Sequence, residues 1–135
     1  MKKLFILFLM PLLLGGCKEK NQEPAQETLH QYTMYVGTND KDTYQCEIGI
    51  DAAKELVYGI MMDHFSDGFT MYEADGVWRD EDGVVTHETT FVCIVVQPNS
   101  IEVYKAADAL IVALNQSTIL ITSSTNTQID FYTGK

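Results

Sequence analysis

Basic residues are scarce in this sequence. It has 9 Lys and Arg residues against 19 Asp and Glu residues, which gives a formal net charge of −10 at pH 7. The phosphate backbone of nucleic acids repels so acidic a chain, so nucleic-acid binding is disfavoured and we expect no nucleic-acid partner. The same charge attracts positive partners, and a basic protein partner is one interpretation. The other is that the acidity only keeps an exposed protein soluble.

Motifs of known chemistry are also missing. The sequence has no G-x-S-x-G nucleophile elbow, no phosphate-binding loop and no cysteine–histidine signature. The histidines His30, His64 and His87 are scattered without ligand spacing, and the acidic run 80–82 lacks the ligand pattern of a calcium loop. His87 and Glu88 point to opposite faces of one expected strand, so they cannot share a metal ion. We expect no metal, no cofactor and no catalytic residue.

Long apolar runs are limited to one. Residues 4–14 are apolar except for Pro11, follow two lysines and precede Gly15-Gly16-Cys17. The run is about half the roughly 20 residues that a membrane-spanning helix needs, and its flanks are typical of a secretory signal peptide. Its end resembles the bacterial lipobox. That resemblance implies cleavage between Gly16 and Cys17 and a diacylglyceryl group on Cys17, hence a membrane partner through a lipid anchor.

Three segments follow from this reading. Residues 1–16 are the expected signal peptide, residues 17–27 the lipidated cysteine and a disordered tether, and residues 28–135 a folded domain. The tether is polar, contains Pro24 and has no apolar period. Cleavage removes two of the nine basic residues and makes the mature net charge −12. We expect an extracytoplasmic protein, lipid-anchored to the bacterial cell membrane or outer membrane.

Cysteine is scarce as well. Beyond Cys17 the chain has only Cys46 and Cys93, which have one possible pairing, and a disulfide is allowed outside the cytoplasm. However, Cys93 lies in the apolar run 91–96, which is typical of an inert thiol in a core. The sequence favours the buried thiol and leaves the disulfide open.

Apolar periodicity predicts six regular elements after residue 28. Acidic residues that end in glycine at 79–83 are typical of a hairpin turn. Asn99, with Glu102 three residues later, predicts a helix N-cap with a capping box. The predicted order is a strand at 31–38, a helix at 51–65, strands at 69–78 and 84–96, a helix from Asn99 to Leu114 and a strand from 118, with 128–132 as its extension or an edge strand.

This order, β-α-β-β-α-β, predicts an α+β domain of the ferredoxin-like class. In that fold a four-stranded antiparallel sheet carries two helices on one face. The run 91–96 is apolar at every position, so neither face of that strand is expected to be wet. We therefore expect a homodimer that forms through the open sheet face. The alternatives are that a ligand or a partner protein covers this face.

One stretch resembles a known family. Residues 65–70 read Phe-Ser-Asp-Gly-Phe-Thr, residues 76–80 read Gly-Val-Trp-Arg-Asp, and Gly83 and Glu88 follow. This resembles the F-P-D-G-L-T, G-x-W-R-D, G, E pattern of small bacterial proteins known as domain of unknown function 3574. The resemblance implies a ferredoxin-like fold and often an envelope location, and it implies no reaction. The matching residues are Asp67, Gly68, Thr70, Gly76, Trp78, Arg79, Gly83 and Glu88.

Most of this motif suits structural work. Asp67 and Gly68 suit a turn from helix to strand, and Gly76 suits a bulge or close packing. Trp78 is expected to cap the open end of the sheet, with Arg79 paired to a nearby carboxylate. A structural role is therefore favoured over a functional one.

Three functions stay open. The first is a non-catalytic binding or interaction lipoprotein that uses the open sheet face or the loops at its end. The second is an inhibitor or immunity-type lipoprotein that neutralises a cationic protein, which the acidity favours through electrostatic steering. The third is a small cofactor-free enzyme of the dimeric α/β barrel type, assembled from residues far apart in the sequence.

Overall fold

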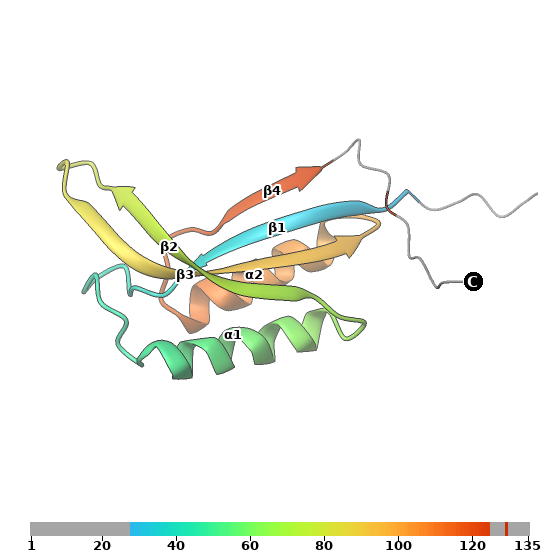
Figure 1. The fold of residues 1–135 in the computed structure, drawn as a ribbon, viewed down its shortest axis with the longest axis horizontal. Coiled ribbons are helices and arrows are strands. Elements are labelled where there is room, and N and C mark those ends of the chain that lie inside the picture. Colours follow the sequence, from blue (N-terminus) through green and yellow to red (C-terminus); the bar gives the residue numbers. More distant parts are fainter. Residues whose placement is uncertain (1–27, 125–128, 130–135) are drawn as a thin grey trace, which may run out of the picture.

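A computed structural model describes residues 28–124 and 129 of the chain. Its elements, in order, are β1 (His30–Gly37), α1 (Ile50–His64), β2 (Thr70–Arg79), β3 (Val85–Gln97), α2 (Ile101–Ala113) and β4 (Leu120–Ser124) (Figure 1). The predicted order is confirmed, with the compared boundaries shifted by one or two residues. Gly16, Cys17, the predicted signal peptide and tether, and the run 128–132 apart from Ile129 lie outside the described residues.

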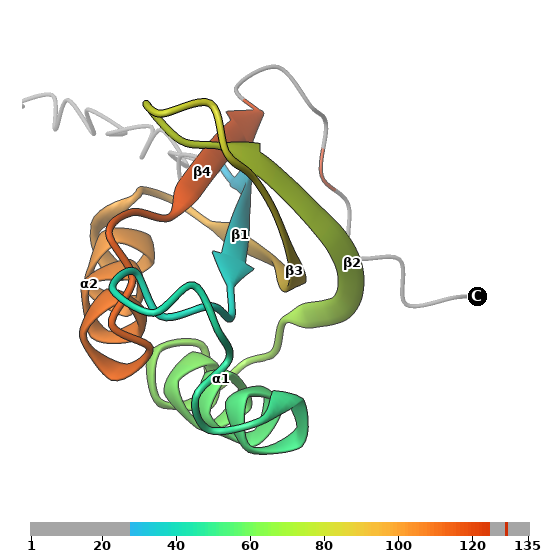
Figure 2. The ribbon, with the colours of Figure 1, turned by 90° about the vertical axis from the view of Figure 1, so that its left-hand side faces the viewer.

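The four strands form one antiparallel sheet in the order β2-β3-β1-β4. Both helices lie on the same side of it and leave the other side open (Figure 2). The predicted α+β, ferredoxin-like arrangement is thereby confirmed. Within residues 28–124 and 129, no helix has the length and apolar character needed to cross a membrane.

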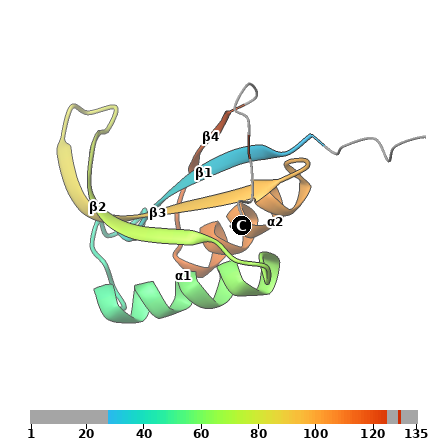
Figure 3. The same cartoon turned by 45° about the vertical axis from the view of Figure 1, so that its right-hand side comes forward.

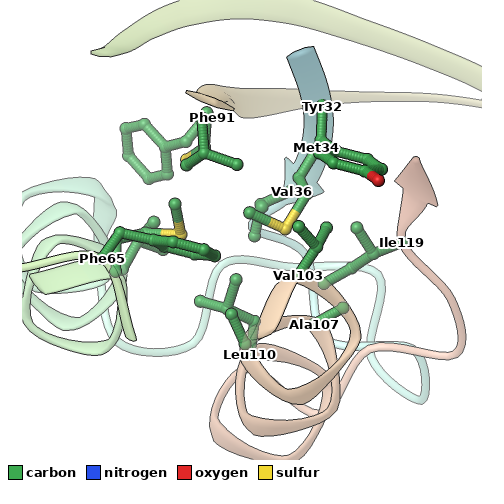
Figure 4. Close-up of a cluster of buried hydrophobic side chains, with 14 of the residues drawn as sticks. Tyr32, Met34, Val36, Phe65, Phe91, Val103, Ala107, Leu110 and Ile119 are labelled. Carbon is green, nitrogen blue, oxygen red and sulfur yellow. The ribbon is translucent and has the colours of Figure 1, made fainter. Parts of the chain in front are cut away.

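The core fills the space between the sheet and the helices (Figure 4). Because side chains alternate along a strand, every second residue of β1 and β3 reaches it, while the helices contribute residues three or four positions apart. The fully buried members are Met34 and Val36 of β1, Ala53, Val57 and Met61 of α1, Phe91 and Cys93 of β3, and Val103, Ala106 and Leu110 of α2. Burial of each large apolar side chain contributes about 1.5–3 kcal/mol.

Both cysteines of the described domain are free, so the disulfide alternative is wrong for this structure. Cys93 is completely buried beneath the helices, as its apolar neighbours in sequence predict. Burial raises the pKa of its thiol to about 12, because the thiolate would lose its hydration. Cys93 is therefore an inert packing residue at neutral pH.

The predicted capping box is wrong. The N-cap of α2 is Ser100, and Asn99 instead accepts a hydrogen bond through Oδ1 from the backbone N of Ile101 at 3.0 Å. Glu102 does not bond back to the cap, because its carboxylate is taken up elsewhere. Its Oε2 lies 3.1 Å from Nδ1 of His64, and its Oε1 accepts a hydrogen bond from Nζ of Lys105 at 2.7 Å. Glu102 thus links the end of α1 to the start of α2.

The turn residues of the family-like motif shape the connections to the hairpin strands. Gly68 has a φ of +124°, and its backbone N donates to the carbonyl of Phe65, just before β2. Gly83 has a φ of +84° in the β2–β3 hairpin. Left-handed backbone of this kind favours glycine at both positions. Arg79 donates through Nη1 to the carbonyl of Gly83 at 3.3 Å, so its expected pairing with a carboxylate is wrong among the described residues.

Two neighbouring residues of α2 provide a test of the core. Leu110 is completely buried, whereas Val112 is 81% exposed on the outer side of the same helix. We expect Leu110→Ala to lower the free energy of unfolding by about 2–5 kcal/mol, because it removes apolar contacts and leaves a cavity. Val112→Ala should change it by less than about 0.5 kcal/mol. Urea unfolding followed by circular dichroism measures both, and equal effects would contradict the assigned core.

Candidate functional site: a cavity on the open sheet face

The chain itself partly covers the open face of the sheet. Val92 of β3 lies between Tyr35 of β1 and Tyr72 of β2 in the strand register. Val92 is only 2% exposed although no helix covers it, while the two tyrosines are 38% and 51% exposed. Neighbouring aromatic side chains on one sheet face shield the residue between them. The apolar centre of β3 is therefore kept from water here by side chains of the same sheet.

Side-chain size along β2 creates a hollow next to these tyrosines. The residues of β2 on the open face run from large to small and back to large: Tyr72, Ala74, Gly76 and Trp78. Toward its turn the β2–β3 hairpin bends away from the helices (Figures 1 and 3). Trp78 packs against Tyr44 of the loop after β1, with ring centroids 5.7 Å apart. The bent hairpin and this aromatic pair close one end of the hollow.

The result is a cavity of about 780 Å³, hereafter the sheet-face cavity. Its floor comes from all four strands, and its walls come from the hairpin and from the loops that follow β1 and α2. It is lined by Tyr35, Gly37, Asn39, Asp40, Lys41, Asp42, Tyr44, Tyr72, Ala74, Asp75, Gly76, Val77, Trp78, Glu88, Thr90, Val92, Gln116, Ser117, Thr118 and Leu120.

Glu88 lies at the floor of the cavity because a neighbouring glycine makes room for it. A Cβ on Gly37 would stand 2.5 Å and 2.6 Å from the two carboxylate oxygens of Glu88. The carboxylate therefore rests directly over the backbone of β1. Its Oε2 accepts a hydrogen bond from the backbone N of Asn39 at 3.1 Å. These contacts fix the position of a charged group that a side chain at position 37 would displace.

Gly76 of β2 likewise leaves room for neighbouring side chains, on the other side of β3. A Cβ at this position would overlap Oγ1 of Thr90 and lie 3.1 Å from Cγ of Glu88. The β2–β3 register continues without interruption past Gly76, which pairs with Glu88. Of the two predicted roles, the structure shows close packing rather than a bulge. Thr90 is only 8% exposed, so its side chain has little space to yield.

The loop wall is held together by residues far apart in the sequence. Oδ1 of Asp40 accepts hydrogen bonds from the backbone N of Asp42 and Thr43, at 2.8 Å and 3.2 Å. Its Oδ2 accepts one from Nδ2 of Asn115 at 2.9 Å. These bonds, that from Asn115 first, lower the pKa of Asp40, because they stabilise the charged form. Gln116 adds a hydrogen bond from Nε2 to the carbonyl of Asn39.

The cavity lining is strongly acidic. It contains the carboxylates of Asp40, Asp42 and Glu88 and one basic residue, Lys41, whereas the side chain of Asp75 alternates to the other face of β2. Lys41 is already occupied, since its Nζ lies 3.4 Å from Oδ2 of Asp42 and also donates to Oδ1 of Asn115. Across the described part of the chain, no three His, Cys, Asp or Glu residues are grouped to hold a metal ion.

The cavity gathers three residues of the family-like motif, namely Gly76, Trp78 and Glu88. The motif residues Asp67, Gly68, Thr70, Arg79 and Gly83 lie outside it, in turns or at strand ends. Sequence reasoning did not single out Tyr35, Gly37, Tyr72 or Ala74. Their signal is the alternation along β1 and β2, where small residues interrupt a row of aromatic ones on one face. His87, as expected, does not share the site of Glu88.

A family model described as "Protein of unknown function (DUF3574)" matches residues 31–128. No curated protein matches the chain in sequence. Among solved structures, a phage SAM lyase in complex with S-methyl-5'-thioadenosine is similar, with a TM-score of 0.53 and 17% identity over 77% of this chain and 86% of that chain.

The apo state of a phage SAM lyase has a TM-score of 0.47 at 17% identity, covering 76% of this chain and 84% of its own. An adenosylmethionine decarboxylase from Aquifex aeolicus has a TM-score of 0.39 at 15% identity, covering 82% and 100%. At these identities the likeness to the lyase complex concerns the fold alone.

The contact between Gly76 and Thr90 can be tested by mutation. We expect Gly76→Ala to destabilise the domain by about 1–3 kcal/mol, because the added methyl overlaps Thr90 in a packed sheet. Thr90→Ala in the same chain should recover part of the loss, which a double-mutant cycle in urea measures. Gly59 of α1 is the control, since nothing lies within 4 Å of its Cβ position. Gly59→Ala should stabilise the helix by about 0.5–1 kcal/mol. Additive effects at positions 76 and 90 would contradict the contact.

The wall contact between Asp40 and Asn115 makes the stability of the domain depend on pH through the pKa of Asp40. Because the pKa of Asp40 is lowered, its contribution to stability is full above the ordinary value of 3.8 and is lost as the pH falls through the folded-state pKa. Asn115 has a φ of +48°, so Asn115→Gly keeps the backbone and removes the donor. We expect this variant to raise the pKa of Asp40 toward 3.8, measured by NMR titration of the carboxyl carbons.

Glu102 serves as the internal control for that titration. Its pKa is lowered by Lys105 and His64 at the opposite end of α2, and it should not respond to the Asn115 variant. An unchanged pKa of Asp40 in Asn115→Gly would show that the wall contact does not hold in solution.

Proposed function

The chain belongs to the DUF3574 family, and we propose that it is a non-catalytic binding module that takes up a small molecule in the sheet-face cavity. We further propose that a lipid on Cys17 holds the module outside the cytoplasm, at the surface of the cell membrane or outer membrane.

The cavity itself is the observation that carries this proposal. Its volume of about 780 Å³ falls within the range of about 300–1,000 Å³ that is usual for small-molecule sites. Its floor is a hydrogen-bonded sheet and its wall is held by the Asp40–Asn115 contact, so the site is formed before any ligand arrives. A concave, preformed site that combines aromatic side chains with polar and charged groups suits the binding of a small molecule.

The direction of the chain supports the anchored arrangement. β1 begins at His30, which pairs with Gln97 at one end of the sheet. The cavity lining includes Gly37, at the other end of β1, and Trp78 of the β2–β3 hairpin, which bends at that end of the sheet (Figure 1). An anchor that precedes β1 therefore joins the domain at the end remote from the cavity.

The concave shape also favours a small ligand over the inhibitor alternative. An acidic surface attracts a small cation and a basic protein alike. A protein inhibitor usually contributes about 800 Å² of surface to its complex, over 20–30 residues. The distinctive geometry here is instead a hollow between strands, where Ala74 and Gly76 leave room beside larger neighbours.

Native mass spectrometry of the mature, full chain from its own host tests this proposal. We expect a monomer that carries an added small-molecule mass, on a protein that begins at a diacylglyceryl Cys17. Ala74→Trp should abolish the added mass, because the indole fills the floor of the cavity. Glu55→Trp, at an exposed position of α1 outside the lining, should retain it.

Other outcomes would overturn the proposal. A dimer without added mass would mean that a second copy closes the open face. An added mass that survives Ala74→Trp would place the ligand elsewhere on the domain.

A further inference from the structure

We infer that the ligand of the sheet-face cavity is a small organic cation, held by the Glu88 carboxylate and by aromatic side chains that line the same cavity. This inference rests on the proposed function, because it names the chemical class of the molecule that the cavity takes up.

Glu88 supplies the charge for this recognition. Within the described residues its carboxylate accepts one hydrogen bond, from the backbone N of Asn39, and no basic side chain pairs with it. A carboxylate can accept about four hydrogen bonds, so most of its capacity faces the cavity. Gly37 and Gly76 leave room for it in the floor, and the hydrogen bond from Asn39 positions it there. A positive group in the cavity would meet a charge that is already in place.

The aromatic residues determine what kind of cation fits. Tyr35, Tyr44, Tyr72 and Trp78 all line the cavity. Aromatic faces attract cations that shed water easily, and quaternary ammonium groups are the usual example. A hard metal ion instead needs several oxygen ligands close together, and the described carboxylates are not grouped in that way. The lining therefore suits a cation with an apolar surface.

The same charges disfavour a second copy of this chain as the occupant. In a two-fold symmetric dimer each subunit contributes the same surface patch to the interface. Such a pairing would set three carboxylates of one copy against three of the other, with one lysine on each side. Like charges brought together in this way oppose association. A small cation instead neutralises the lining.

The single tryptophan of the chain gives a direct assay. Trp78 is the only tryptophan in the sequence and it lines the cavity. We expect choline to change its fluorescence in a saturable way when added to the full-length mature chain at constant ionic strength. The neutral isostere 3,3-dimethyl-1-butanol has the same shape without the charge, and it should bind at least about tenfold more weakly.

Matched variants separate the local charge from the overall charge. Glu88→Gln should weaken choline binding about tenfold, because it removes the charge at the floor. Glu81→Gln makes the same change on the exposed hairpin turn, outside the lining, and should leave the affinity unaltered. Tyr44→Leu, which removes the ring packed against Trp78 in the loop beside Glu88, should also weaken choline more than the neutral isostere. Thermal unfolding of each variant shows whether it is folded.

The outcomes distinguish this inference from the proposed function. Equal affinities for choline and its isostere, both lost in Ala74→Trp, would refute the cation and leave the binding module intact. No saturable response to choline would refute the inference as well, while the native mass spectrum still tests whether the cavity holds another ligand. Equal weakening by Glu88→Gln and Glu81→Gln would reduce the effect to net charge and also overturn it.

Discussion

A sheet with helices on one side leaves its other face uncovered, and apolar residues on that face must be shielded from nonspecific association. Here β3 runs through the middle of the sheet and its residues 91–96 are apolar on both faces, so the requirement is severe. Tyr35 and Tyr72 meet it over Val92, which they flank in the register and which is only 2% exposed. Next to these large side chains, the small residues Ala74 and Gly76 leave a hollow. The cover of the apolar strand and the wall of the cavity are thus the same residues.

The two glycines that flank β3 set the chemical character of that hollow. A glycine inside a strand weakens the sheet, because it contributes no side chain and loses more backbone freedom on folding. Gly37 and Gly76 are kept in contact with Glu88 and Thr90, where any Cβ would collide. A sheet selected only for stability would place β-branched residues at these positions. The two glycines give up side-chain packing in the sheet, and in its place the carboxylate of Glu88 lies in the floor of the cavity.

The fold was readable from the sequence because its signals are local. Alternation along the strands, the spacing of Val57 and Met61 on α1, and the glycine that ends the hairpin each specify an element within a short window. The capping box failed because a tertiary contact, the pairing of Glu102 with His64, overrode the local pattern. The cavity was not readable for a related reason. Its wall joins Asp40 to Asn115, which is 75 positions away, and its floor depends on cross-strand register.

The family-like motif suited structural work when taken as a string of residues, and its turn positions do serve the fold. Yet Gly83 turns the hairpin whose strand carries Trp78, and Trp78 closes the cavity against Tyr44. Gly76 packs on Thr90 and thereby leaves the space above it empty. In this domain the residues that shape the backbone also shape the site. The hollow forms where β2 has small side chains between large ones. A structural and a binding role for the motif are therefore two consequences of the same geometry.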